Sequence, residues 1–109
     1  MNFEILATPQ FRRDIKKLVK KYPSLKEEYF ELVEMLQQNP KLGISLGDDC
    51  FKIRLAIASK GKGKSGGARI ITYVVVKDKT VFLLTIYDKS EKESISAKEL
   101  QILLSQIEV

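Results

Sequence analysis

The sequence predicts one α+β domain over residues 1–109, with a small, mostly antiparallel sheet of about four strands, an N-terminal helical hairpin on one sheet face and a C-terminal helix. A chain of 109 residues has the length of a single domain, and its 44% hydrophobic and 30% charged residues are ordinary globular usage. Apolar side chains recur at helical spacing up to residue 36, whereas from Cys50 onwards they alternate with polar ones. The predicted order of elements is β-α-α-β-β-β-α.

A short strand is predicted over residues 2–7, followed by a helix that begins after Thr8 and is broken by Pro23. Thr8 suits the N-cap and Pro9 the first helical position, where no backbone N–H is needed. The apolar face of this helix is expected to lie in the core and consists of Phe11, Ile15, Leu18, Val19 and Tyr22. The opposite face is basic and is interpreted as solvated surface, with Arg12, Arg13, Lys16, Lys17, Lys20 and Lys21.

A second helix is predicted to begin with a capping box of Ser24 and Glu27 and to end at Asn39-Pro40. Its apolar stripe consists of Leu25, Tyr29, Leu32, Val33 and Leu36. The short link between the two stripes indicates a helical hairpin that covers one sheet face. Residues 41–49 are polar and contain glycine, so they are predicted to form a loop.

Three consecutive strands are predicted next, and the first of them begins at Cys50. Residues 59–67 follow that strand, hold four glycines and are expected to form a flexible loop. Residues 68–76 and 80–87 are expected to pair as a hairpin around a turn at 77–79. A second capping box, Ser96 with Glu99, opens the last helix.

The positive charge is concentrated in one block. The formal net charge of the chain is +5, and residues 51–80 carry eight lysines and arginines against Asp78 alone, a net charge of +7. Such a block is typical of a protein that binds a polyanion. Histidine is absent, and the single Cys50 excludes an internal disulfide. The sequence shows no secretory signal and no membrane-length apolar run, so a cytoplasmic protein without a membrane partner, metal or cofactor is expected.

Strand alternation places Lys52 and Arg54 on the face opposite Phe51, Ile53 and Leu55. If the helices cover the apolar face, both cations project from an open face that suits single-stranded RNA. Whether Arg69 joins them depends on strand register, which the sequence leaves open. Further predicted RNA contacts are Lys60, Lys62 and Lys64 in the glycine-rich loop, Lys89, and the rings of Tyr73 and Tyr87, which are otherwise ordinary sheet aromatics.

Three strings of residues resemble the RelE/HigB group of toxins from type II toxin–antitoxin modules. They are Lys52-Ile-Arg-Leu, then Ser59-Lys-Gly-Lys-Gly-Lys-Ser-Gly-Gly-Ala-Arg-Ile-Ile-Thr-Tyr73, then Phe82-Leu-Leu-Thr-Ile-Tyr-Asp-Lys-Ser-Glu-Lys92. The resemblance implies a RelE-like fold and an mRNA endoribonuclease that acts at the ribosomal A site. It also implies a cognate antitoxin encoded by an adjacent gene, with operator DNA bound only through that antitoxin.

The resemblance further implies metal-independent cleavage by the ribose 2′-hydroxyl, with Lys52, Arg54, Arg69 and Lys92 as catalytic residues. Arginines suit phosphate binding because they stay protonated, and Lys52 suits the base if neighbouring cations lower its pKa. Some relatives use an arginine after the last strand and a tyrosine before the last helix, where this chain has Ser90 and Ser96. Lys92, Tyr87 or Asp88 are the candidate replacements. Two alternatives remain: a ParE-like gyrase inhibitor, which binds without catalysis, and a non-catalytic RNA-binding module.

Overall fold

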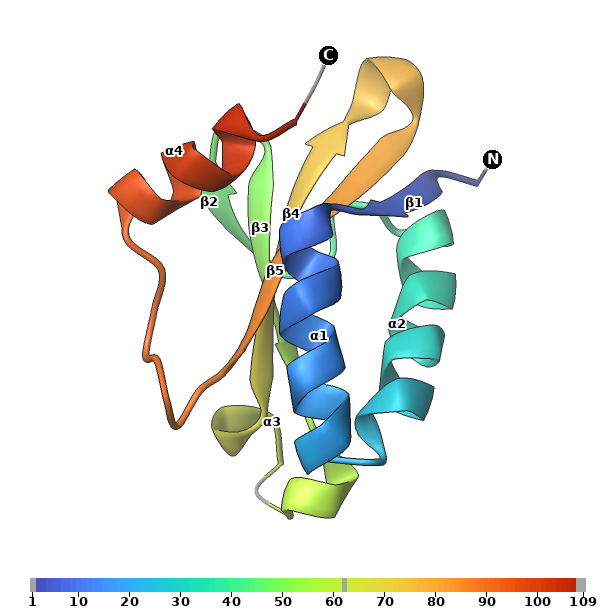
Figure 1. Ribbon diagram of the computed structural model, residues 1–109. Coiled ribbons are helices and arrows are strands. Elements are labelled where there is room, and N and C mark those ends of the chain that lie inside the picture. Colours follow the sequence, from blue (N-terminus) through green and yellow to red (C-terminus); the bar gives the residue numbers. More distant parts are fainter. Residues whose placement is uncertain (1, 62, 108–109) are drawn as a thin grey trace.

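The computed structural model describes residues 2–61 and 63–107 (Figure 1). Within this part of the chain, the strands are β1 (Glu4–Ala7), β2 (Ile44–Gly47), β3 (Cys50–Leu55), β4 (Ala68–Val75) and β5 (Thr80–Asp88). The helices are α1 (Pro9–Lys21), α2 (Leu25–Gln38), the single turn α3 (Gly63–Gly66) and α4 (Ala97–Ser105). Two 3-10 turns, η1 (Ala58–Lys60) and η2 (Val76–Asp78), lie in the connections. The predicted α+β class is confirmed.

The strands form one mixed sheet in the order β1-β5-β4-β3-β2. Neighbouring strands are antiparallel, except that β1 runs parallel to β5. The sheet is therefore mostly antiparallel, as predicted, but it has five strands in the described residues rather than about four. The additional strand is β2.

The prediction that residues 41–49 form a loop is wrong for Ile44–Gly47. These residues form the edge strand β2, which pairs with the first half of β3. Gly47 lies opposite Cys50, and the two residues between them, Asp48 and Asp49, have φ values of 53° and 61°. Positive φ at both central residues is what a tight type I′ hairpin turn requires, and aspartate tolerates it better than most residues. The Asp-Asp pair was the available signal for this hairpin.

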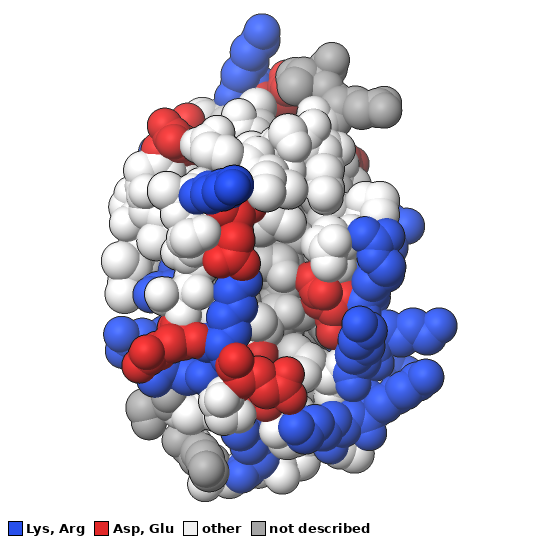
Figure 2. Space-filling view, turned by 60° about the vertical axis from the view of Figure 1, so that its left-hand side comes forward, with Lys and Arg blue, Asp and Glu red and all other residues white. Residues whose placement is uncertain are grey.

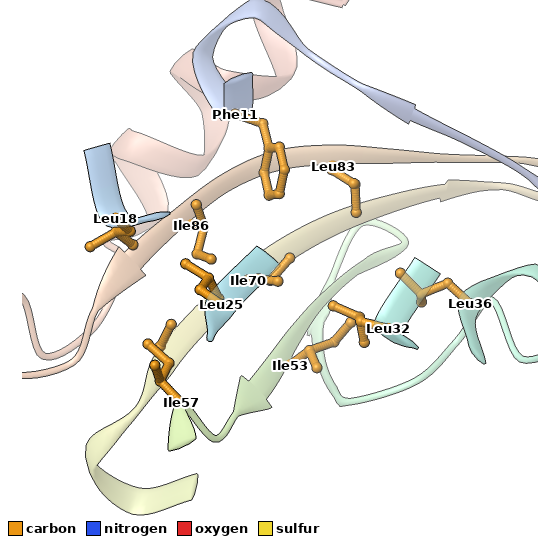
Figure 3. Packing of buried hydrophobic residues seen from close by; sticks show 11 residues of the cluster. Phe11, Leu18, Leu25, Leu32, Leu36, Ile53, Ile57, Ile70, Leu83 and Ile86 are labelled. Carbon is orange, nitrogen blue, oxygen red and sulfur yellow. The ribbon is translucent and has the colours of Figure 1, made fainter. Parts of the chain in front are cut away.

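Helices α1 and α2 lie side by side over one face of the sheet (Figure 1). Figure 3 shows their buried side chains packed against side chains from β3, β4 and β5, which form the main core of the domain. This cluster includes Phe11, Leu18, Leu25, Leu32, Leu36, Ile53, Ile70, Leu83 and Ile86. The predicted stripe of α1 is confirmed, and that of α2 is confirmed except for Val33, which is half-buried and outside this cluster. Ile53 and Leu55 face the core as predicted, whereas Phe51 is half-buried and outside the cluster.

The opposite sheet face is not open, which corrects the prediction. Helix α4 packs on it through Leu100, with Leu103 and Leu104 at the edge of the contact. Its partners on the sheet are Cys50, Ile71, Leu84 and Tyr87. The apolar side of α4 is buried against the sheet face that bears Lys52 and Arg54. The C-terminal helix therefore covers part of that face.

Two of the three predicted helix caps are present. The Thr8 hydroxyl accepts a hydrogen bond from the Phe11 N–H at 3.2 Å, and Ser96 and Glu99 form a reciprocal capping box. The capping box predicted at Ser24 is wrong. Ser24 has helical φ and ψ, and its hydroxyl accepts a hydrogen bond from the Ser59 N–H at 2.9 Å instead.

We expect Ser96→Ala to lower the free energy of unfolding by about 1 kcal/mol, because it removes the acceptor for the Glu99 N–H. Urea denaturation followed by circular dichroism measures this. The matched control is Ser94→Ala, an exposed serine two residues earlier, which should stay within about 0.5 kcal/mol of the wild type. Equal losses in the two variants would show that the cap contributes nothing.

Candidate nucleic-acid interface

Three predicted site residues form a row across the sheet. Arg54 on β3 lies opposite Arg69 on β4, which lies opposite Tyr87 on β5. Side chains directly opposite one another project from the same sheet face, so Arg69 does join Arg54. Lys52 lies two residues before Arg54 on β3, and therefore on the same face. The strand register thus brings together the basic residues that the sequence could not place relative to one another.

The two arginines differ in exposure. Arg54 is exposed, Lys52 is half-buried, and Arg69 is only 3% exposed. The guanidinium of Arg69 donates a hydrogen bond to the Ala68 carbonyl at 3.1 Å. Burial, and after it the charge of Arg54, lowers the pKa of Arg69. Because arginine still keeps its proton in proteins, the row holds two adjacent positive charges that an anion would stabilise.

Tyr87 reaches this face because β5 contains an extra residue. Ile71 pairs with Thr85 and Thr72 with Leu83, which leaves Leu84 as a bulge residue. Burial of the phenol group is the main cause of the raised pKa of Tyr87, so its hydroxyl keeps its proton at neutral pH. Among the described residues, that buried hydroxyl has no hydrogen-bond partner. A protonated hydroxyl on the same face as two guanidinium groups is an available donor to a phosphate oxygen.

Lys92 also lies at this face. Its ammonium is 5.4 Å from the centre of the Tyr87 ring and forms an ion pair with Glu99. Glu99 is the capping residue of α4, so one carboxylate connects the start of that helix to Lys92. Sequence reasoning interpreted Glu99 only as a capping residue and missed its second partner, because the contact depends on the path of the chain after β5.

A depression of about 360 Å³ lies between α1, β5 and α4. Its polar lining consists of Gln10, Asp14, Thr85, Tyr87, Lys92, Glu99 and Gln106. The Thr85 hydroxyl donates to the Asp14 carboxylate at 2.6 Å. Asp14 was not predicted as a site residue, since its position on α1 gave no indication that it faces β5.

Asp88, the last residue of β5, has a different role from the acid or base suggested by the sequence. Its side chain is fully buried and accepts hydrogen bonds from Tyr22 at 2.9 Å, from the Ser90 hydroxyl at 2.8 Å and from Lys60. Burial alone would raise the pKa of Asp88, but the bonds from Lys60, Ser90 and Tyr22 outweigh burial and hold the pKa well below its ordinary value. Asp88 is therefore a fixed negative charge that joins α1, η1 and the segment after β5.

The same ion pair holds Lys60, a predicted RNA contact, against Asp88 with its side chain only 8% exposed. Tyr73 is half-buried and stacks on Phe82 with ring centres 6.2 Å apart, as a sheet aromatic does. Lys89 is half-buried, and its backbone N–H donates to the Gly67 carbonyl. Lys62 and the side chain of Lys64 lie outside the described part of the chain.

The loop predicted over residues 59–67 contains the end of η1 and the single turn α3 in its described part, so it is not irregular throughout. It returns tightly to the sheet at Gly67, where a Cβ atom would lie 2.1 Å from the Leu55 carbonyl oxygen. Glycine is required there because the backbones approach so closely. This contact fixes where β4, and with it Arg69, begins.

Among residues 2–61 and 63–107, no group of three or more histidine, cysteine, aspartate and glutamate side chains is placed to hold a metal ion. None of the described helices is both long and apolar enough to cross a bilayer.

Comparison with known proteins identifies the family. The family of the RelE toxin of the RelE/RelB toxin–antitoxin system matches residues 8–107. The chain belongs to the RelE toxin family. The resemblance to RelE/HigB toxins seen in the sequence is therefore confirmed.

Solved RelE structures share the fold at low identity. A mutant of the Escherichia coli toxin RelE in the free state is 16% identical, with a TM-score of 0.60 over 97% of this chain and 94% of that chain. The toxin–antitoxin complex RelBE of E. coli matches with 17% identity and a TM-score of 0.60, over 79% of this chain and 95% of that one. The complex RelBE2 of Mycobacterium tuberculosis matches with 17% identity and a TM-score of 0.54, over 81% and 92%. The RelE-like fold is thus shared.

Proposed function

We propose that this RelE-family protein cleaves mRNA on the ribosome as an endoribonuclease and thereby inhibits translation. The observation that carries the proposal is the row Arg54–Arg69–Tyr87 on the sheet face that also bears Lys52 and Lys92. The row combines two positive charges with a protonated hydroxyl on one sheet face, and two of its three members, Arg69 and Tyr87, are buried. A phosphodiester is an anion whose cleavage adds negative charge, so these groups match it.

Cleavage by the ribose 2′-hydroxyl transfers the 2′ proton to a base, forms the bond from the 2′ oxygen to phosphorus and breaks the bond to the 5′ oxygen, which takes up a proton. Arg54 and Arg69 are suited to bind the non-bridging oxygens, because guanidinium groups stay charged and donate two parallel hydrogen bonds. Lys52 is the proposed base for the 2′ proton. The 2′,3′-cyclic phosphate and a free 5′-hydroxyl are the expected products.

The proton for the 5′ oxygen has two candidate donors in this chain. The Tyr87 hydroxyl is protonated and without a partner among the described residues, and the Lys92 ammonium lies over the Tyr87 ring. Ser96 and Ser90 are not available in its place, because Ser96 caps α4 and the Ser90 hydroxyl donates to Asp88. We propose Tyr87 as the donor and Lys92 as the charge that assists it.

The proposed protein partner is an antitoxin encoded by an adjacent gene, and operator DNA would be bound only through that partner. A groove of about 560 Å³ between α2 and the edge of β3 supports this. Most of its lining is apolar, with Met35 and Ile44 each about half exposed, and Glu28, Glu31, Lys52 and Arg54 also border it. An amphipathic segment that presents apolar side chains fits such a groove.

The proposal is tested by adding the purified protein to a defined mRNA in a reconstituted translation system, with and without ribosomes. Primer extension should map cuts within codons at the ribosomal A site, with 5′-hydroxyl ends that polynucleotide kinase can label. Intact mRNA with unimpaired translation would refute the proposal. Inhibited gyrase supercoiling would then favour the ParE-like alternative, and salt-sensitive RNA binding without cleavage would favour a binding module.

A further inference from the structure

The depression between α1, β5 and α4 adjoins the candidate site, and most of the residues that line it have no role in the proposed cleavage. Strand β1 pairs with β5 only as far as Leu83, and the residues Thr85, Ile86 and Tyr87 beyond that point line the depression. Figure 2 looks onto this side of the molecule, where the surface is hollowed between acidic side chains. The depression is thus a pocket at the edge of β5, between two helices that pack on opposite faces of the sheet.

The depression and the candidate site share two side chains. Tyr87 belongs to the row across the sheet, Lys92 lies over the Tyr87 ring, and both line the depression. The Tyr87 hydroxyl is buried and has no hydrogen-bond partner among the described residues. A group bound in the depression therefore lies next to the groups proposed to act on the scissile phosphate. In an RNA substrate, that group is the base of a nucleotide beside the cleaved bond.

The size and the walls of the depression suit a single base. Its volume of about 360 Å³ is at the small end of the range of about 300–1,000 Å³ that is usual for ligand pockets. Ile95, Ile102 and Leu103 supply aliphatic walls, and Ile102 is about half exposed. Enzymes that bind an unpaired base hold its faces between aromatic or apolar side chains and read its edge by hydrogen bonds.

Asp14 on α1 provides the carboxylate that can read that edge. It accepts hydrogen bonds from the Thr85 hydroxyl at 2.6 Å and from the Gln10 amide at 3.0 Å, and it forms no ion pair with any described residue. The other carboxylate in the lining, Glu99, is paired with Lys92. A carboxylate offers about four acceptor positions, so Asp14 is held in place by two bonds and retains the capacity to accept others.

A group that only accepts hydrogen bonds discriminates between the four bases. Guanine presents two neighbouring donors, N1–H and the N2 amino group, and one carboxylate can accept from both. Adenine and cytosine each place a ring nitrogen with a lone pair beside their amino group. Uracil places its N3–H between two carbonyl oxygens. A carboxylate repels these lone pairs, so guanine is the base that Asp14 matches.

We infer that the depression binds the base of a nucleotide beside the cleaved bond and that Asp14 gives it a preference for guanine. Thr85 is a positioning residue in this arrangement, because its hydroxyl holds the Asp14 carboxylate at the edge of β5. The inference deepens the proposed function, and it rests on that function for the place of the base in the reaction. Guanine binding itself can be measured without cleavage.

The first test measures cleavage rates in the reconstituted translation system with mRNAs in which each base of the A-site codon is varied in turn. The variants are Asp14→Asn, whose amide oxygen can still accept from Thr85, and Thr85→Val, which keeps the shape of the side chain without its hydroxyl. The matched control is Glu34→Gln, which makes the same change from carboxylate to amide at an exposed position on α2. Circular dichroism checks that all three variants are folded.

We expect guanine at one codon position to raise the cleavage rate of the wild type at least about tenfold over the other bases. Asp14→Asn should lose this preference and favour adenine or cytosine at the same position, because its amide offers a donor beside an acceptor. Thr85→Val should weaken the preference without reversing it, and Glu34→Gln should keep it. A purely structural role of Asp14 would not change which base is favoured.

Two results would overturn the inference and leave the proposed function standing. One is cleavage by the wild type with no preference for guanine. The other is a guanine preference that Asp14→Asn leaves intact, which would mean that the base is read elsewhere. If Asp14→Asn is unfolded, Thr85→Val decides in its place, and an unchanged preference in that variant would overturn the inference.

Binding decides the inference if the wild type cuts no mRNA. The probes are four fluorescent 2′-fluoro pentanucleotides, all uridine except for the central base, which lack the attacking hydroxyl. Anisotropy should show that the wild type binds the guanine probe at least about fivefold more tightly than the others, and that Asp14→Asn does not. This result without cleavage would support the pocket and refute the endoribonuclease. Equal binding of the four probes, again without cleavage, would overturn both.

Discussion

Replacing Arg69 with alanine is expected to slow mRNA cleavage by about 10²–10³-fold while the protein stays folded. Arg69 is the buried member of the cross-strand row, and its charge is held next to Arg54 where solvent screens it little. A charge fixed in this way stabilises a developing phosphorane more than a solvated one does. Single-turnover cleavage of ribosome-bound mRNA measures the effect. Arg69→Lys should recover only part of the activity, because lysine lacks the planar pair of donors.

Stability distinguishes a functional Arg69 from a structural one. Arg54→Gln removes an exposed cation from the same row, so it should slow cleavage without lowering the midpoint of urea unfolding, since it relieves repulsion between like charges. Lys77→Gln, at the tip of the β4–β5 hairpin, is the matched control and should leave both quantities unchanged. Full activity in either arginine variant would contradict the site assignment. An unfolded Arg69→Ala, with Arg54→Gln as active as wild type, would mean that the row is structural.

Asp88→Asn is expected to lower the free energy of unfolding by about 3–5 kcal/mol, because it leaves the Lys60 ammonium buried without a countercharge. The double variant Lys60→Met/Asp88→Asn should regain part of the loss, since it removes the unpaired charge. Urea unfolding of the single and double variants measures the coupling. Glu91→Gln breaks the exposed ion pair with Lys21 and should change stability little. A fully stable Asp88→Asn would show that the ion pair does not support the fold.

The same carboxylate predicts a pH dependence. The pKa of Asp88 in the folded protein lies below its ordinary value of 3.8, so the charged form stabilises the fold at neutral pH. This contribution should be complete above about pH 5 and should decline as the pH falls below the unfolded-state pKa of about 4. The free energy of unfolding of the wild type should therefore fall more steeply in acid than that of Asp88→Asn. Parallel pH profiles would contradict the assignment.

Local patterns predicted most of the fold. Thr8 and Ser96 cap helices because their partners lie three residues away in the chain, and the alternation at Ile53 and Arg54 holds because a strand has only two faces. Ser24 has the same local pattern as Ser96, yet it bonds to Ser59, 35 residues away. The sequence around Ser24 contains no indication of that contact.

Only some of the site residues could be predicted, because contacts between residues far apart in the chain bring the site together. Lys52 and Arg54 were predicted from one strand, but Arg69 joins them only through register. Lys60 looked like an exposed loop cation, and its partner Asp88 lies 28 residues further on. The packing of α4 on the face of Lys52 and Arg54 also could not be predicted. The apolar stripe of a helix does not indicate which face of the sheet the helix will cover.

The bulge in β5 makes the site depend on residue count as well as residue type. Phe82 and Leu84 lie on one face, and strict alternation would place Ile86 there as well, but the extra residue gives that face to Tyr87 and turns Ile86 to the main core. A one-residue deletion near Thr85 would exchange the two, so an isoleucine would enter the row and a tyrosine the hydrocarbon interior. An ungapped comparison with a relative that lacks the bulge would equate residues from opposite sides of the sheet. Insertions and deletions at this point are therefore changes of chemistry, even where every flanking amino acid is unchanged.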